Sequence, residues 1–352
     1  MRLEFLSSTP PNATEGSGTW VAIDGVLRGL AALGHVATLR PLRARSGVHT
    51  FDRWRYNREL VRTPPGADVV IGVDLDGFLW APRRAPRMPY AVMLKGIIAD
   101  ERRNERGLVR ALLALQAGWE RRNVHAADRV IVPSRYSAGV AQDVYGVPAG
   151  TLVVVPEPID LSEWRRRFAA VAPRSNPAPT VLAVARMYPR KRLEDLVRAA
   201  HGLRSRIPGL RVRIVGEGPE SARLRRLAQD LGLADTVTFL GEISRQALAV
   251  EYVGADCFCL PTVQEGFGIV FTEAMAAGLP VVACRAAAVP EVVEDGRTGL
   301  LVSPRSPEEL VMAMEKLLTR EALRRELGDN GRRRVEALDL PRVAARVLEA
   351  LA

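Results

Sequence analysis

Short apolar runs alternate with segments of helical periodicity along most of the chain. In the first half these runs predict strands at residues 2–6, 36–39, 69–73, 90–94, 129–132 and 152–155, with helices at about 20–33 and 109–126. In the second half they predict strands at 180–185, 212–215, 237–240, 256–260 and 281–284. Strands that alternate with helices are typical of a doubly wound parallel sheet. The pattern therefore predicts an α/β fold.

The chain has 352 residues, which is enough for two domains of ordinary size. Residues 168–180 are rich in alanine and proline and include Pro173, Pro177 and Pro179. Such a segment between two sets of strands indicates a linker. We therefore expect the two domains to be joined near residues 165–179.

The most informative stretch is residues 261–302. A buried strand is expected to end at Pro261, and the loop Glu265-Gly266-Phe267-Gly268 follows it. The helix expected from Ile269 to residue 277 is stopped by a glycine and a proline. A strand, a glycine-rich loop and a helix in this order present backbone N–H groups and a helix N-terminus to a phosphate.

Two carboxylates flank this loop. Glu265 lies on it, and Glu273 lies about one turn into the helix. Because a carboxylate accepts hydrogen bonds from two adjacent hydroxyls, the pair is suited to hold one diol on each side of a phosphate. A nucleotide sugar has this layout. The alternative is that Glu273 is a favourable acid of the first turns and Glu265 is solvated. The glycines favour the binding interpretation.

Cations and further glycine loops follow other strand ends of the second half. Arg186 and Lys191 stand between a strand end and a helix N-terminus, where both can reach an anion. Gly216 and Gly218 form a G-x-G after the next strand, a pattern that is also common in simple turns.

The stretch with Glu265 and Glu273 eight positions apart resembles the signature of the family 4 retaining glycosyltransferases, which carry E-x7-E in this setting. The resemblance extends through most of the second half. It implies the GT-B fold, in which two Rossmann-like domains face each other across a cleft. Here these would be residues 1–167, with a C-terminal helix at about 340–352, and residues 178–339. It also implies transfer of a hexosyl group from a nucleotide diphosphate sugar with retention at the anomeric carbon.

The resemblance assigns roles to residues of the second half. Glu265, Arg186 and Lys191 would be catalytic, with Glu265 on the sugar hydroxyls and both cations on the diphosphate. Glu273 would hold the ribose. The remaining donor contacts would come from two loops near the nucleobase and from the glycine-rich loop: Gly216, Gly218, Glu242, Ile243, Gly266, Phe267, Gly268 and Ile269.

In the first half the match is less complete. Many family members carry a histidine near the transferred sugar where this chain has Lys95, and Glu157-Pro158 replaces their Asn-Gly. The expected cleft or acceptor residues are Gly16 and Gly18 in a loop at 12–19, Lys95, Asp100 and Ser134. The acceptor itself is left open between a glycan, a lipid-linked molecule and a small molecule.

Charge and composition add few constraints. The formal net charge is +10, but the basic residues are scattered, which argues against nucleic acid as a partner. The basic segment 43–62 contains Phe51, Trp54 and Tyr56, so an anionic membrane surface is kept as an alternative to a packed, solvated helix. Asp74-Leu75-Asp76 has the D-x-D pattern of metal sites but lies in the half away from the proposed donor site. The family resemblance implies transfer without a metal, and we expect no cofactor besides the donor co-substrate.

Three cysteines, Cys257, Cys259 and Cys284, fall in expected core strands and indicate buried thiols in a reducing compartment. No apolar run approaches the roughly 18 residues of a membrane span. We therefore expect a cytoplasmic protein, with peripheral attachment at the inner membrane face left open. The functional alternatives are a non-catalytic nucleotide-sugar binding protein, a basic nucleic-acid binder and, more remotely, a nucleotide-sugar isomerase.

Overall fold

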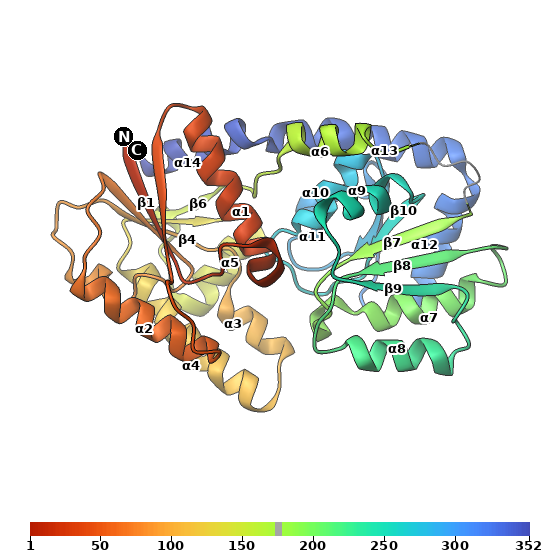
Figure 1. The fold of residues 1–352 in the computed structure, drawn as a ribbon, viewed down its shortest axis with the longest axis horizontal. Helices are drawn as coiled ribbons and strands as arrows, with labels where there is room; N and C mark the ends of the chain where they lie inside the picture. Colours follow the sequence, from red (N-terminus) through yellow and green to blue (C-terminus); the bar gives the residue numbers. More distant parts are fainter. Residues whose placement is uncertain (173–177) are drawn as a thin grey trace. The chain divides into compact units, whose positions relative to one another are not determined.

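The computed structural model describes residues 1–172 and 178–352, and the side chains of residues 13–17 are not described. The contacts divide the chain into two compact units, Met1–Pro158 with Leu338–Ala352 and Ile159–Ala337. Each unit has one parallel six-stranded sheet covered by helices (Figure 1). The predicted α/β architecture with doubly wound sheets is confirmed.

The first sheet has the order β2-β1-β3-β4-β5-β6. Its strands are β1 (Arg2–Ser7), β2 (Val36–Pro41), β3 (Val69–Val73), β4 (Tyr90–Met93), β5 (Arg129–Val132) and β6 (Leu152–Val154). Its main helices are α1 (Ala13–Ala32), α2 (His49–Arg62), α3 (Ile98–Glu101), α4 (Gly107–His125), α5 (Arg135–Val140) and α14 (Leu340–Leu351). The strand order reverses between β1 and β3: β2 lies on the outer side of β1, whereas β4, β5 and β6 follow on the other side of β3. Ligands of open α/β sheets bind at such reversal points.

The second sheet has the order β12-β11-β10-β7-β8-β9. Its strands are β7 (Thr180–Val184), β8 (Arg211–Val215), β9 (Val237–Gly241), β10 (Cys257–Leu260), β11 (Val281–Cys284) and β12 (Gly299–Val302). Its helices are α6 (Leu161–Ala169), α7 (Leu193–Leu203), α8 (Ser221–Asp230), α9 (Arg245–Val253), α10 (Ile269–Ala277), α11 (Val289–Val292), α12 (Pro307–Thr319) and α13 (Glu321–Val335). Here the order reverses between β7 and β10.

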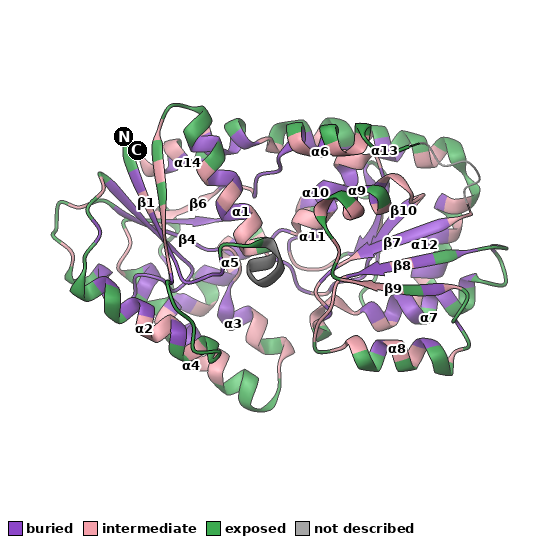
Figure 2. Ribbon diagram, viewed as in Figure 1, coloured by how far each residue is buried: buried purple, intermediate pink, exposed green. Residues whose placement is uncertain are grey.

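The central strands of both sheets are buried on both faces (Figure 2). They are near-continuous apolar runs, such as Val69–Val73 and Cys257–Leu260, because helices cover both sides of a parallel sheet. All three cysteines are free and buried in this core, as expected. Among the described helices, none has the length and apolarity that crossing a bilayer requires.

The C-terminal helix α14 packs on α1 of the first unit. A side chain at Gly29 of α1 would place its Cβ 2.5 Å from the carbonyl oxygen of Leu340, and one at Gly25 would meet Pro158 at 2.8 Å. Gly29 is therefore required for the close approach of the two helices, and Gly25 is required for the packing of Pro158 against α1. The hydrophobic face of α14, including Val343 and Val347, completes the core of this unit.

Three features differ from the sequence expectation. Helix α1 begins at Ala13, so Gly18 lies inside a helix and not in the predicted loop at 12–19. Helix α6 and strand β12 were not predicted. The start of α6 is marked by Asp160, whose carboxylate accepts a hydrogen bond from the backbone N–H of Glu163 at 2.8 Å. This Asp-x-x-Glu spacing resembles a capping box and could have revealed the helix.

By its contacts with α9 and α10, α6 belongs to the second unit, which begins at Ile159. The sequence-based domain limits at 167 and 178 stay predictions.

Candidate active site

The second sheet brings two polar loops together at its reversal point. The carboxyl end of β7 leads to Arg186 and Lys191, and the carboxyl end of neighbouring β10 leads to Glu265. Backbone contacts tie these loops to each other. The N–H of Val263 donates to the carbonyl of Arg190 at 2.9 Å. The crevice outside these strand ends is where an open α/β sheet binds its ligand.

Within this pair of loops, the ammonium group of Lys191 forms an ion pair with the carboxylate of Glu265. The two side chains are 13% and 11% exposed, so the pair is largely shielded from water. Partly desolvated charges interact more strongly than surface charges. The contact joins residues 74 positions apart and sets the ammonium group of Lys191 beside the carboxylate of Glu265.

Further cationic groups surround Tyr188 on the β7 loop. The guanidinium of Arg186 lies 5.6 Å from the centre of the Tyr188 ring, and that of Arg190 lies 4.8 Å from it. Cation–π contacts at these distances hold guanidinium groups in place. Sequence reasoning selected Arg186 and did not select Arg190. Tyr188 was missed, although an aromatic residue between two arginines was a readable signal.

Helix α10 begins as predicted, at Ile269. Gly268 precedes it with a φ of 93°, and no side chain caps the helix there. A Cβ at this glycine would lie 2.6 Å from the Phe271 ring, so the position needs glycine. Because Gly268 has no side chain, it cannot cap the first N–H groups of α10. A helix N-terminus of this kind attracts an anion.

Glu273 lies on the second turn of α10 and is buried. Its carboxylate accepts a hydrogen bond of 3.0 Å from the hydroxyl of Tyr252 on α9. Burial raises the pKa of Glu273 to about 7, against the opposing effects of the Arg245 charge and the Tyr252 hydrogen bond. The acid is thus held near the midpoint of its titration at neutral pH.

The glycine loop after β8 has a packing explanation. A Cβ at Gly216 would lie 2.1 Å from the carbonyl oxygen of Ala185, and one at Gly218 would lie 2.7 Å from the N–H nitrogen of Met187. These glycines let the loop after β8 lie against the loop after β7, so a ligand is not needed to account for them. At the end of β9, Glu242 is exposed and Ile243 is half-buried.

The first unit explains the unusual Lys95. Its ammonium group forms a 2.8 Å ion pair with Glu157, and the two side chains are 5% and 6% exposed. Lys95 and Glu157 are two of the positions at which the sequence departs from the family pattern. Because each side chain neutralises the buried charge of the other, the lysine and the glutamate depend on each other structurally.

Other expected acceptor-side residues have local partners. Asp100 accepts a 2.8 Å hydrogen bond from the hydroxyl of Tyr136, and Ser134 caps α5 by accepting from the N–H of Ser137 at 3.0 Å. Gly18 is an exposed residue of α1, and Gly16 lies among residues 13–17, whose side chains are not described. These contacts do not bring the acceptor-side residues together into one cluster.

The carboxyl ends of β1 and β3 hold an acidic cluster of which sequence reasoning noted only the D-x-D pattern. Asp76 accepts hydrogen bonds from the backbone N–H of Ser8 at 2.6 Å and from Asn57 at 3.1 Å. Burial raises the pKa of Asp74 to about 6 and raises that of Glu120 well above its usual range. Asp76 thus anchors the β1 loop. Among the described residues, no group of acids, histidines and cysteines has the arrangement of a metal site.

A cavity of about 530 Å³ also lies in the second unit, on α6, α9, α10 and α13. None of Arg186, Lys191, Glu265 and Glu273 lines it. The loops after β7 and β10 and this cavity are therefore two separate features of the second unit.

Comparison with known proteins places the chain in a family. Residues 17–163 match the family described as glycosyltransferase family 4, and residues 165–334 match glycosyl transferases group 1. The GDP-mannose-dependent alpha-(1-6)-phosphatidylinositol monomannoside mannosyltransferase of Mycobacterium tuberculosis is 37% identical over 210 residues, covering 56% of this chain and 54% of the relative. D-inositol 3-phosphate glycosyltransferase of Actinosynnema mirum is 36% identical over 224 residues, with coverages of 60% and 54%. The chain spans about half the length of these curated relatives.

Solved structures match over nearly the whole chain. Sucrose-phosphate synthase from Thermosynechococcus elongatus has a TM-score of 0.80 at 24% identity, with 99% of this chain and 97% of that chain covered. HepE from Anabaena, solved in complex with UDP-glucose, has a TM-score of 0.76 at 20% identity, with coverages of 100% and 99%. These likenesses show the fold. The chain belongs to the family 4 (group 1) glycosyltransferases, and its fold is GT-B.

Proposed function

We propose that the protein transfers a hexosyl group from a nucleotide diphosphate sugar to an acceptor, with retention of the anomeric configuration. The observation that carries the proposal is the Lys191–Glu265 ion pair beside the uncapped N-terminus of α10, at the reversal point of the second sheet. A cation, a set of N–H groups and a carboxylate match a diphosphate followed by a sugar diol.

The reaction breaks the bond between the anomeric carbon and a phosphate oxygen. The leaving diphosphate takes the electron pair, and Arg186, Lys191 and the first N–H groups of α10 stabilise its charge. Glu265 holds hydroxyls of the sugar and Glu273 holds the ribose. The acceptor oxygen attacks the same face of the sugar, and its proton passes to the leaving phosphate. No metal takes part in this scheme.

The relatives suggest which donor and acceptor to test first. The mycobacterial relative is named for GDP-mannose and a phosphatidylinositol mannoside, and the Actinosynnema relative is named for inositol 3-phosphate. We therefore propose GDP-mannose as the donor and a phosphorylated or lipid-linked polyol as the acceptor. The wild-type protein should transfer a labelled sugar from GDP-mannose to such an acceptor or to water. If GDP-mannose is not used, UDP-glucose is the next donor to test.

The decisive variants are Glu265→Gln and Lys191→Ala, with Lys316→Ala as a control lysine on the exposed side of α12. The first two should lose transfer while keeping their far-ultraviolet circular dichroism, and the control should retain it. Wild-type turnover in both site variants would contradict the proposed site. A protein that binds nucleotide sugars but neither hydrolyses nor transfers any labelled donor would be the non-catalytic alternative.

An anionic membrane surface is a further proposed partner, and α2 supports it. Phe51 is 48% exposed and the preceding Val48 is 58% exposed, while Arg43, Arg45 and Arg58 are exposed nearby. Basic and apolar groups on a helix and on the segment that precedes it are suited to lipid headgroups. Phe51→Asp should reduce co-sedimentation with phosphatidylserine vesicles, whereas Met312→Asp, at an equally exposed position of the second unit, should not. Absence of wild-type co-sedimentation would remove this partner.

A further inference from the structure

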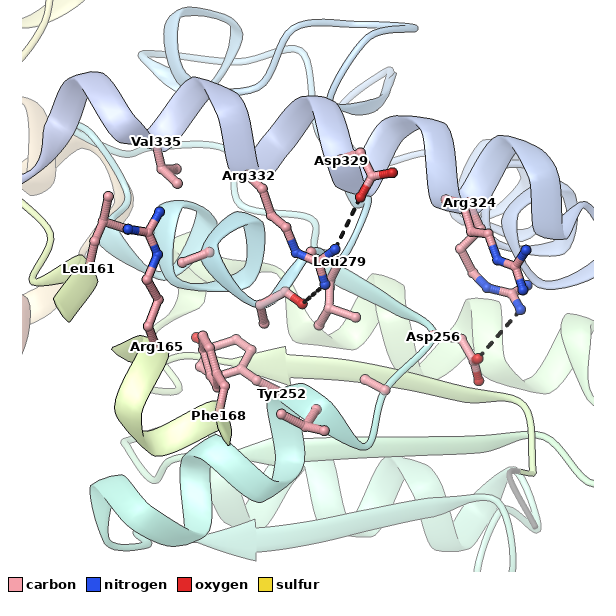
Figure 3. Close-up of a pocket in the computed structure, with 16 residues that line it drawn as sticks. Leu161, Arg165, Phe168, Tyr252, Asp256, Leu279, Arg324, Asp329, Arg332 and Val335 are labelled. Atoms are coloured by element: carbon pink, nitrogen blue, oxygen red, sulfur yellow. Dashed lines mark hydrogen bonds and ion pairs between the residues drawn. The ribbon is translucent and has the colours of Figure 1, made fainter. Parts of the chain in front are cut away.

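The cavity on the second unit is built from α6, α9, α10 and α13 (Figure 3). Its volume of about 530 Å³ lies within the usual range for small-molecule sites. The residues at its wall belong to segments about 170 positions apart, from Leu161 to Val335. The hollow is therefore formed where segments distant in the sequence pack together, and not between two neighbouring side chains.

The wall of the cavity is rich in guanidinium groups. Four arginines, Arg165, Arg324, Arg325 and Arg332, line the cavity together with two aspartates. Each arginine has an acidic partner, but the pairs of Arg165 with Glu336 and of Arg325 with Glu321 are solvent-exposed and therefore weak, so an anion can compete for these two guanidinium groups. Arginine presents a planar set of donors that matches a carboxylate or phosphate in a bidentate contact.

Two of these arginines are held in position by the protein. Arg332 donates to the carbonyl of Ala277 at 3.0 Å and to Asp329 at 3.0 Å. Arg324 donates to the carbonyl of Leu317 at 3.0 Å and lies 3.8 Å from Asp256. Figure 3 shows these contacts as dashed lines at Asp329 and Asp256. Because the guanidinium groups are already ordered, a ligand would bind them with little loss of side-chain entropy.

The opposite side of the cavity is apolar and aromatic. Phe168 and Tyr252 lie next to each other there (Figure 3). The Phe168 ring stacks on Trp164 with 5.2 Å between centres, and the Tyr252 ring meets Trp164 edge-on at 5.6 Å. A rigid aromatic wall facing a row of cations suits a ligand with an apolar body and an anionic head.

Tyr252 also connects this cavity to the candidate active site. Tyr252 borders the cavity from a fully buried position, its ring packs edge-on against Phe168, and its hydroxyl donates the hydrogen bond to Glu273. Any displacement of the Tyr252 side chain therefore changes its hydrogen bond to Glu273, the proposed ribose-binding acid. A ligand that fixes or shifts the Tyr252 ring has a physical route to the donor site.

We propose that this cavity binds a small organic oxyanion, a phosphate or a carboxylate carrying an aromatic or short alkyl group, and that its occupancy is coupled to nucleotide binding through Tyr252 and Glu273. The coupling rests on the proposed function, whereas the binding site does not. Because coupling between two binding sites is reciprocal, the nucleotide must change the affinity for the oxyanion by the same factor.

The binding site is tested with phenyl phosphate, benzoate and phenol as probes. Trp164 is the only tryptophan within Ile159–Ala337, so its fluorescence reports on this unit. Phenyl phosphate, benzoate or both should change the fluorescence with saturation, phenol should not, and Trp164→Phe should remove the signal. The response to each anion distinguishes a phosphate site from a carboxylate site.

A matched pair of variants locates the ligand. Arg165 is exposed to 61% and pairs with Glu336, and Arg206 is exposed to 52% and pairs with Glu315 outside the cavity. Arg165→Gln should weaken anion binding about tenfold, and Arg206→Gln should leave it unchanged. Saturation by neither anion, or equal weakening by both variants, would overturn the binding site.

The coupling is tested by titrating GDP and UDP with and without saturating oxyanion. We expect the nucleotide affinity of the wild type to change at least about fivefold, the lower end of typical coupling. In Tyr252→Phe the oxyanion should still bind, but the nucleotide affinity should no longer respond to it. An unchanged nucleotide affinity in the wild type overturns the coupling alone. If neither nucleotide binds, the proposed function and the coupling both fail, while the fluorescence experiment still decides the cavity.

Discussion

Replacing the buried Glu273 by glutamine should stabilise the protein at alkaline pH. The pKa of Glu273 is about 7 in the folded state, against an ordinary value of 4.5. At 1.36 kcal/mol per pH unit, this difference corresponds to about 3 kcal/mol. The folded protein binds this proton more tightly than the unfolded chain, so stability is full below pH 4.5, falls as pH rises to about 7 and is lower by that amount at pH 8. Glutamine carries no charge and keeps an oxygen that can accept from Tyr252.

The Glu273→Gln variant should therefore match the wild type near pH 4.5 and exceed its free energy of unfolding by up to about 3 kcal/mol at pH 8. Urea titrations followed by Trp164 fluorescence report on the second unit. Asp295→Asn is the control: the pKa of Asp295 is lowered from 3.8, so its stabilising contribution is present throughout pH 4.5–8 and its removal should cost about the same at both ends of that range. A Glu273→Gln variant equally destabilised at both pH values would refute the reasoning. The expected result would mean that the negative charge of Glu273, the proposed ribose contact, destabilises the folded protein at alkaline pH.

Three further predictions concern the first unit and the chemistry. Lys95→Met should lower the free energy of unfolding by about 3–5 kcal/mol in urea titrations, because the Glu157 carboxylate is left buried without its cation. The double variant Lys95→Met with Glu157→Gln should recover most of that loss. Equal losses in the single and double variants would argue against the pair. Gly29→Ala should lower the melting temperature, because the added methyl group pushes α14 away from α1. Gly118→Ala, which has open space around its Cα, should instead stabilise helix α4 by up to about 1 kcal/mol. Equal effects of the two substitutions would contradict the close contact between α1 and α14. Transfer should persist in EDTA, and loss of activity that Mg²⁺ restores would show that a metal is needed.

Sequence reasoning predicted the parts of the structure that depend on local signals. Helix α10 is bounded by Gly268 and Gly278, two residues in left-handed conformations, and its limits were predicted without error. The neighbourhood of Lys191 and Glu265 followed from the rule that loops at the carboxyl ends of parallel strands meet at one edge of the sheet. Their direct ion pair is what the structure adds.

Contacts between distant residues without a local signal were not predictable. Glu157 lies 62 positions from Lys95, and no pattern in either segment reveals the pair. The resemblance directed attention to Lys95 as a replacement for a sugar contact, whereas the structure shows a buried cation already neutralised. In the same way, Glu273 was assigned to the ribose, and its hydrogen bond to Tyr252 became visible only with α9 packed beside α10.

The central claim is that the loops after β7 and β10 bind a diphosphate. Calorimetric titration of GDP and UDP into the wild type, Lys191→Ala, Glu265→Gln and Lys316→Ala tests it most directly. Losing the Lys191 contact should weaken the better nucleotide by about 1.5–3 kcal/mol, or roughly 10-fold to 100-fold. Glu265→Gln should not weaken it, because it removes a negative charge beside Lys191, and Lys316→Ala should have no effect. Wild-type nucleotide affinity in Lys191→Ala would contradict the account.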